Sequence, residues 1–202
     1  DFGYYRLPTD DEMEEGKERV FEHFGSAGDC FLGGENLLEN MTYLTLRHNL
    51  LICRSSRIAF TRPLDADDFA GAEMFLEHTQ AASTNTVLLM AALRPLWETG
   101  AMPENSTSML TIDLLDRDGD KVPCQLAIPQ DLLKAYLEER IGEGVRSFLV
   151  ALKKAFAQGM PEHIHVLLAG NASRSRWVSG FCGLQEGDEE GMLLGQRMQA
   201  YI

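Results

Sequence analysis

The sequence predicts an α/β fold, and three patterns carry this prediction. At residues 18–45 and again at residues 163–176, a short strand-like segment leads through a glycine-containing turn into a helical pattern. Between them, residues 109–128 have the alternation and the turn that are typical of a β-hairpin. A chain of 202 residues with 45% apolar and 24% charged residues is long enough for one sizeable core or two small sub-domains.

The first strand is expected within Glu18–Phe24, where apolar and polar residues fall into two alternating phases. Residues 25–34 are rich in glycine, and the apolar residues from Leu37 to Leu44 then follow helical spacing. A glycine-rich turn that opens a helix presents free backbone N–H groups, which can bind an anion. The acidic run before this strand, residues 10–18, is expected to be a solvated loop or a fraying terminus.

Two further helices are expected in the middle of the chain. Asp65 is a candidate N-cap for the first, with Phe69, Ala72 and Leu76 on its inner face. The second is expected from about Thr84 to Glu98, where Pro95 should kink or end it.

A β-hairpin is expected next, formed by residues 109–114 and 122–128 around the Asp118-Gly119 turn. The aspartates at positions 116, 118 and 120 resemble the start of a calcium-binding loop. The rest of that motif, including its closing glutamate, is missing, so we interpret the segment as a turn that needs no metal.

The last third of the chain is expected to hold a long helix pair followed by a buried strand. Pro129 suits the first position of a helix, and the apolar stripe after it is interrupted by Gly142 and Gly144 before it resumes up to Phe156. The apolar run 163–169 is typical of a buried strand, and another helix is expected near Arg176.

Charge and cysteine content exclude several classes of function. A formal charge of −13 repels phosphate backbones, which argues against nucleic-acid binding. The longest apolar run, residues 87–93, is too short for a membrane span. The four cysteines lie far apart without a C-x-x-C pair, and these are Cys30, Cys53, Cys124 and Cys182. We therefore expect that their thiols are reduced and that the protein is cytoplasmic.

Two motifs resemble those of the DnaK-type heat-shock chaperones. Residues 28–36 read GDCFLGGEN, which is similar to the family's G-D-x-x-L-G-G-E-D. Residues 166–175 read VLLAGNASRS and resemble its adenosine motif, in which a strand is followed by two small residues, two small hydroxylated residues and an arginine. Both motifs stand in the family's order and at roughly its spacing, so the resemblance covers about residues 1–185.

The resemblance implies one lobe of an actin-like ATPase. Residues 1–32 and 142–202 would form an inner, nucleotide-facing sub-domain, and residues 33–141 would form an outer sub-domain with an antiparallel sheet and helices. The implied ligand is ATP or ADP, with Mg in the full-length protein. The residues that would border this nucleotide are Gly33, Gly34, Glu35, Arg94, Gly170, Asn171, Ala172, Ser173 and Arg174.

The residue types at these positions suit a nucleotide, although the chain departs from the family pattern in places. Small residues let the backbone approach a base closely, and a guanidinium can stack on it. Asn171 stands where the family prefers glycine, and Arg176 where it prefers proline. The helix ending at Glu98 lacks the family's Glu-x-x-Lys-Arg pattern, which leaves Arg94 as its single candidate, and residues 63–83 resemble an insertion.

The family's first phosphate loop, catalytic lysine and metal-binding acids have no counterpart in this sequence, where Asp1-Phe2-Gly3 is followed by Tyr4. We therefore assign no catalytic or metal-binding residue. Because the chain also begins without methionine, we expect a piece of a longer protein that is inactive without its remaining lobe.

Within that longer protein, the resemblance implies a fragment of a DnaK-like, chaperone-type ATPase that contributes the adenosine-side wall of an ATP-binding cleft. Protein partners would bind on the outer sub-domain. Two alternatives stay open: an actin-like ATPase of another branch, filament-forming or kinase-like, and a non-catalytic interaction module that has lost nucleotide binding.

Overall fold

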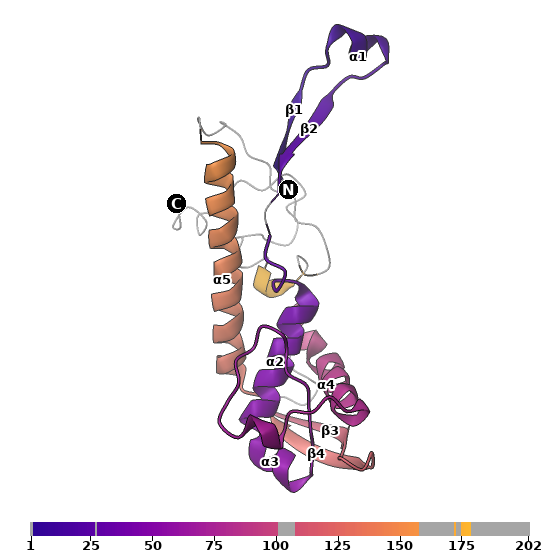
Figure 1. The fold of residues 1–202 in the computed structure, drawn as a ribbon, viewed down its shortest axis with the longest axis vertical. Coiled ribbons are helices and arrows are strands. Elements are labelled where there is room, and N and C mark those ends of the chain that lie inside the picture. The colour runs from indigo at the N-terminus through magenta and orange to yellow at the C-terminus, as the bar shows by residue number, and fades with distance from the viewer. Residues whose placement is uncertain (1, 27, 101–107, 158–171, 173–174, 179–202) are drawn as a thin grey trace.

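The computed structural model describes residues 2–26, 28–100, 108–157, 172 and 175–178 (Figure 1). This part of the chain is a mixed α/β structure with two small antiparallel sheets, each of two strands. Its elements, in chain order, are β1 (Phe2–Arg6), α1 (Asp10–Glu14), β2 (Val20–Gly25), α2 (Gly34–His48), α3 (Leu50–Ser55), a 3₁₀ turn (Ala72–Met74), α4 (Gln80–Thr99), β3 (Met109–Leu115), β4 (Lys121–Ala127) and α5 (Gln130–Ala155).

The described elements form an elongated molecule. In Figure 1 the β1–β2 hairpin projects at one end, the β3–β4 hairpin closes the other end, and α5 runs alongside α2 between them. Helix α2 packs against α4, α5 and β4. It therefore lies at the centre of the main core.

The core consists of apolar side chains that α2, α4, α5 and the β3–β4 hairpin contribute together. Burying each one completely contributes roughly 1.5–3 kcal/mol. The most completely buried members of this core, at 1% exposure or less, include Leu38, Met41, Leu46, Leu89, Leu93, Leu114, Leu126, Leu133 and Leu137.

The β3–β4 hairpin confirms the turn predicted at Asp118-Gly119. The strands pair in register from Met109 opposite Ala127 to Leu115 opposite Lys121. Gly119 has a φ of +89°, and the carboxylate of Asp116 accepts the backbone N–H groups of Asp118 at 2.9 Å and Asp120 at 3.0 Å. The turn itself thus accounts for the aspartate pattern, and among the described residues no group of three or more His, Cys, Asp or Glu side chains could hold a metal.

The prediction of a helix that begins after Asp65 is wrong. Residues 65–71 form turns and irregular structure, and only the short 3₁₀ turn follows. Asp65 instead accepts a hydrogen bond of 2.9 Å from the side chain of Asn40 and lies 3.8 Å from Arg140. Its carboxylate is thus engaged by α2 and α5, which takes it away from a helix N-terminus of its own.

The break predicted at Gly142 and Gly144 is also wrong, because α5 is one continuous helix across both glycines. Gly142 is buried, and a Cβ on Gly144 would lie 2.8 Å from Cδ1 of Leu32. Gly144 lets Leu32 approach α5 closely, and neither glycine ends the helix. The sub-domain boundary predicted after Ile141 falls inside this helix and stays a prediction.

Helix α4 begins four residues before its predicted start at Thr84 and ends within one residue of its predicted end at Glu98. It begins at Gln80, where Thr79 caps it by accepting the N–H of Ala82 at 3.2 Å. It continues past Pro95 to Thr99, where Gly100, with a φ of +69°, closes it. Pro95 therefore does not end the helix.

The acidic run predicted to be a loop contains α1, and Thr9 and Glu12 cap the N-terminus of this helix with a reciprocal capping box. The structure agrees with the predictions of a helix at α2 and of a strand at β2. It also agrees with the helix predicted near Arg176, since residues 176–178 are helical. The strand predicted at His163–Ala169 lies outside the described residues. None of the described helices combines the length and apolarity that a membrane crossing requires.

Candidate functional site

The first part of the candidate site is the N-terminus of α2. Gly33 is its N-cap, with extended backbone angles of φ −64° and ψ 145°, and it makes no side-chain capping bond. Gly34 and Glu35 form the first turn. The backbone N–H groups of such a turn carry the positive end of the helix dipole.

The second part of the site is Ala172, which lies directly against Gly34. A Cβ built on Gly34 would lie 3.1 Å from Cβ of Ala172 and 3.5 Å from Nε1 of Trp97. A side chain at position 34 would therefore push the two segments apart. The structure thus brings one residue from each of the two glycine-containing motifs into contact, although they are far apart in the sequence.

The residues after Ala172 are anchored on the last turn of α4. Ser175 is 1% exposed, and its hydroxyl donates to the carbonyl of Trp97 at 2.8 Å. The indole N–H of Trp177 donates to the carbonyl of Leu96 at 3.3 Å. The carbonyl of Trp97 lies in the last turn of α4, where carbonyls lack a partner within the helix, whereas the carbonyl of Leu96 also accepts the N–H of Gly100 at 3.0 Å.

Sequence reasoning missed this anchor, although one signal for it was present. Ser175 immediately precedes the helical residues 176–178, and its hydroxyl accepts the backbone N–H of Trp177 at 3.3 Å. That is the position of an N-cap serine. The contribution of Trp97 depends on how α4 packs, which no local pattern predicts.

The third part of the site is an ion pair between Glu35 and Arg94. The two guanidinium nitrogens of Arg94 bind the two carboxylate oxygens of Glu35 at 2.7 and 2.9 Å. This hydrogen bonding lowers the pKa of Glu35 and raises that of Arg94, so both stay charged at neutral pH. The pair is exposed, with 68% of the Glu35 side chain and 40% of the Arg94 side chain accessible.

The turn that leads into α2 is held from the other side by α5. Arg140 lies 3.7 Å from the carboxylate of Asp29, and Leu32 packs against Gly144. These two contacts fix residues 29–32 just before Gly33. The position of the α2 N-terminus therefore depends on α5 as well as on α4.

The structure thus brings together four of the nine residues predicted to border a nucleotide, namely Gly33, Gly34, Glu35 and Arg94 around the N-terminus of α2, with Ala172 as a fifth beside them. The remaining four, Gly170, Asn171, Ser173 and Arg174, lie outside the described residues.

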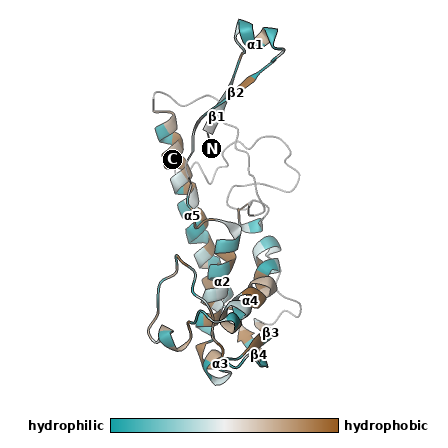
Figure 2. Cartoon of the chain, turned by 45° about the vertical axis from the view of Figure 1, so that its right-hand side comes forward, coloured by the Kyte–Doolittle hydropathy of each residue, from teal (hydrophilic) through white to brown (hydrophobic). Residues whose placement is uncertain are grey.

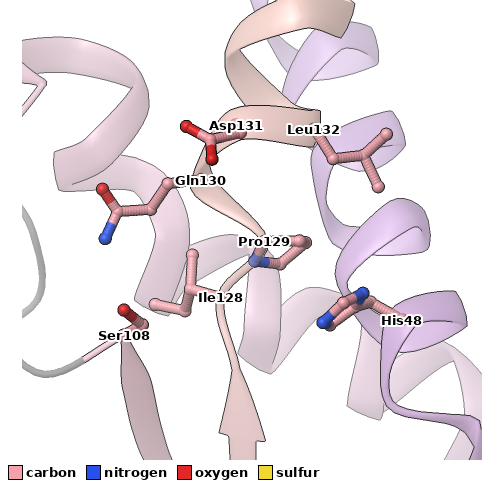
Figure 3. Close-up of a pocket in the computed structure, with 7 residues that line it drawn as sticks. All are labelled: His48, Ser108, Ile128, Pro129, Gln130, Asp131 and Leu132. Carbon is pink, nitrogen blue, oxygen red and sulfur yellow. The ribbon is translucent and has the colours of Figure 1, made fainter.

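A separate pocket of about 510 Å³ lies at the opposite end of α2. Figure 3 shows His48 at the end of α2 near Pro129 and Leu132 at the start of α5. The pocket is open, and none of its residues was assigned a functional role from the sequence. The pocket is therefore separate from the candidate nucleotide wall, because His48 and Gly34 lie at opposite ends of α2.

Comparison with known proteins found no matching protein-family model, no matching curated protein and no matching solved structure.

Proposed function

We propose that this chain contributes the adenosine-side wall of an ATP-binding cleft in a cytoplasmic, DnaK-like, chaperone-type ATPase. The contact between Gly34 and Ala172 carries the proposal, because it joins the two motif segments through residues too small to keep their backbones apart. The proposed architecture is an actin-like lobe whose partner lobe, in a longer protein, would close over Mg-ATP.

The chemistry of the wall supports an adenine nucleotide. Small residues such as Gly34 and Ala172 let their two segments approach each other closely, so a base bound at this wall would lie near backbone. The N-terminus of α2 favours negative charge. Arg94 precedes Trp97 by one turn of α4, and Trp97 lies beside Gly34. The guanidinium of Arg94 therefore offers a flat cationic face near the contact between Gly34 and Ala172. No residue of this chain is proposed to carry out phosphoryl transfer.

Tryptophan fluorescence offers a direct test, because the chain has two tryptophans and both lie at this wall. Titration with ADP or adenosine should change the emission of Trp97 and Trp177 with a dissociation constant on the order of millimolar, since only one wall of the cleft is present. Gly34→Val should weaken this response, whereas the remote surface change Lys121→Ala should leave it unchanged.

One observation favours the interaction module as a second candidate. The bidentate ion pair uses the hydrogen-bonding groups of Glu35 and Arg94 on each other, so neither depends on a ligand. Amide shifts in an NMR titration distinguish the two candidates. Shifts confined to places far from Gly34 and Ala172, or none at tens of millimolar nucleotide, would reject the nucleotide wall and leave the module.

A further inference from the structure

The β1–β2 hairpin and α1, residues 2–25, form an arm that projects from the rest of the molecule (Figure 1). Its sheet has two strands, and within the described residues each pairs with the other alone. An isolated two-stranded hairpin is marginally stable in water. The outer edges of both strands also leave backbone N–H and C=O groups open to pairing.

One face of this arm is apolar and bare. The register places Tyr5 opposite Phe21, and their rings lie 5.2 Å apart between centroids. Tyr5 is 72% exposed and Phe21 is 55% exposed, and Leu7 at 83% continues the apolar surface toward the tip. Figure 2 shows hydrophobic colour on β2 next to the hydrophilic tip. Neighbouring exposed apolar side chains of this kind offer a surface that a partner can cover.

The opposite face of the arm is occupied by its own polar network. Arg6 binds Glu12 at 2.7 Å and Glu22 at 2.5 Å, and the hydroxyl of Tyr4 donates to Glu22 at 2.5 Å. Glu12 also closes the capping box of α1. This network holds the arm in shape without using the Tyr5–Phe21 face.

The tip of the arm carries a surplus of negative charge. Within the described residues, Arg6 pairs with Glu12 and Glu22, Lys17 pairs with Glu15 at 2.7 Å, and Arg19 is exposed without an ion pair. Four further exposed carboxylates around α1 form no ion pair in that part of the structure, and these are Asp10, Asp11, Glu14 and Glu18.

We infer that the arm is a docking surface for a cationic and partly apolar polypeptide segment of another protein. Apolar side chains of the partner would cover Tyr5 and Phe21, its lysines or arginines would face the carboxylates of the tip, and its backbone could pair with a free strand edge. A second copy of this chain fits the arm poorly, because two acidic tips on chains of formal charge −13 repel each other.

The test uses the full chain and a fluorescein-labelled peptide of twelve residues that alternates lysine and valine, followed by fluorescence anisotropy at 150 mM salt. Neutralising the tip with Asp10→Asn, Asp11→Asn, Glu14→Gln and Glu18→Gln should weaken binding at least tenfold. A matched variant removes the same number of exposed carboxylates elsewhere on the chain and should change peptide binding less than twofold. Its substitutions are Glu73→Gln, Asp120→Asn, Asp131→Asn and Glu139→Gln.

The apolar face is tested separately, with the charge unchanged. Phe21→Thr keeps a strand-forming residue and should weaken peptide binding about as much as replacing the peptide's valines with serine. Amide hydrogen exchange of β1 and β2 shows whether each variant keeps the hairpin.

Three results would overturn the docking surface. The first is no binding of the basic peptide to the folded wild-type chain. The second is equal weakening by the tip variant and the matched variant, which would mean attraction to the whole negative surface. The third is a dimer in sedimentation that Phe21→Thr dissociates, which would make a second copy the occupant of the arm.

Discussion

The side chain of Asn85 binds the backbone of Leu115 at both of its polar groups. Its Nδ2 donates to the carbonyl oxygen of Leu115 at 2.7 Å, and its Oδ1 accepts the backbone N–H of the same residue at 2.7 Å. The Nδ2 also donates to the carbonyl of Ala59 at 3.0 Å. Asn85 is fully buried, so one amide on α4 replaces a neighbouring strand at the edge of β3.

Removing this amide should destabilise the fold strongly. Asn85→Ala leaves the partly buried N–H and C=O of Leu115 without these partners, so we expect a loss of about 3 kcal/mol in the free energy of unfolding. Urea unfolding measures it. Ser83→Ala, an exposed neighbour on the same helix, should stay within about 0.5 kcal/mol. Similar losses in the two variants would contradict the strand-replacing role of Asn85.

Asn49 supports the other strand of this hairpin in the same way. Its Nδ2 donates to the carbonyl of Ala127 at 2.8 Å, and its Oδ1 accepts the N–H of Ala127 at 2.8 Å. Asn49 also separates α2 from α3, because its φ of −108° and ψ of 29° lie outside the helical region. The break between these helices thus places an amide at the end of β4.

A side chain at position 34 should separate the two motif segments. Gly34→Val places its Cβ 3.1 Å from Cβ of Ala172, so Ala172 and residues 175–178 should move away from α4 and expose Trp177. We expect a red shift of tryptophan emission without ligand. Gly33→Ala is the matched control, because the nearest atom to its Cβ, the side-chain oxygen of Asn36, is at an ordinary 3.5 Å. An unchanged spectrum for Gly34→Val would contradict the contact.

The arm should open in acid. The hydrogen bonds from Arg6 lower the pKa of Glu12 to about 2, below the value of about 4.3 for an unperturbed glutamate. The stabilisation from this pair is therefore fully present above pH 4.3 and is lost as the pH falls toward 2. Carbon NMR of the Glu12 carboxyl should show this titration, and Arg6→Gln should return its pKa toward 4.3. A Glu12 pKa that Arg6→Gln leaves unchanged would refute the pairing.

The cysteines should differ sharply in reactivity. Cys53 and Cys124 are buried, and burial raises the pKa of Cys53 to about 12, so little reactive thiolate forms at pH 8. Cys30 is exposed. Peptide mass spectrometry after brief iodoacetamide treatment should therefore find Cys30 modified well before Cys53 and Cys124, with all three modified at similar rates in urea. Early modification of Cys53 in the native chain would contradict its burial.

Local patterns predicted the elements whose signals lie within a few residues. The β3–β4 hairpin follows from the Asp118-Gly119 turn, and α2 from the spacing of its apolar residues. The continuous α5 could not be predicted in this way, because the role of Gly144 depends on Leu32 from a distant segment. The helix predicted after Asp65 was wrong for the same reason, since the partners of Asp65, Asn40 and Arg140, lie on two distant helices.

For the candidate site, the motifs predicted which segments should meet, but they did not predict how the side chains are paired. The contact of Gly34 with Ala172 lies where the two motifs were expected to share a wall. The bond between Glu35 and Arg94 depends on the packing of α2 against α4, and no local spacing reveals it. In the arm, β2 was predicted but α1 was missed, because the run of acidic residues was interpreted as a loop although it contains the Thr9–Glu12 capping box.

The Glu35–Arg94 ion pair allows binding and stability to be separated. An exposed pair contributes only about 0–1 kcal/mol to stability, so Arg94→Ala should leave the unfolding midpoint nearly unchanged. If Arg94 supplies a face for the purine, the same change should weaken adenosine or ADP binding several-fold.

Lys134→Ala provides the control for Arg94→Ala, because Lys134 also forms an exposed ion pair, with Glu138 at 3.9 Å on α5. It should change neither stability nor nucleotide affinity. Fluorescence titration and urea unfolding of both variants separate the possibilities. Arg94→Ala that lowers stability without changing affinity would assign the ion pair a purely structural role, because a residue that contacts the base has to change its binding.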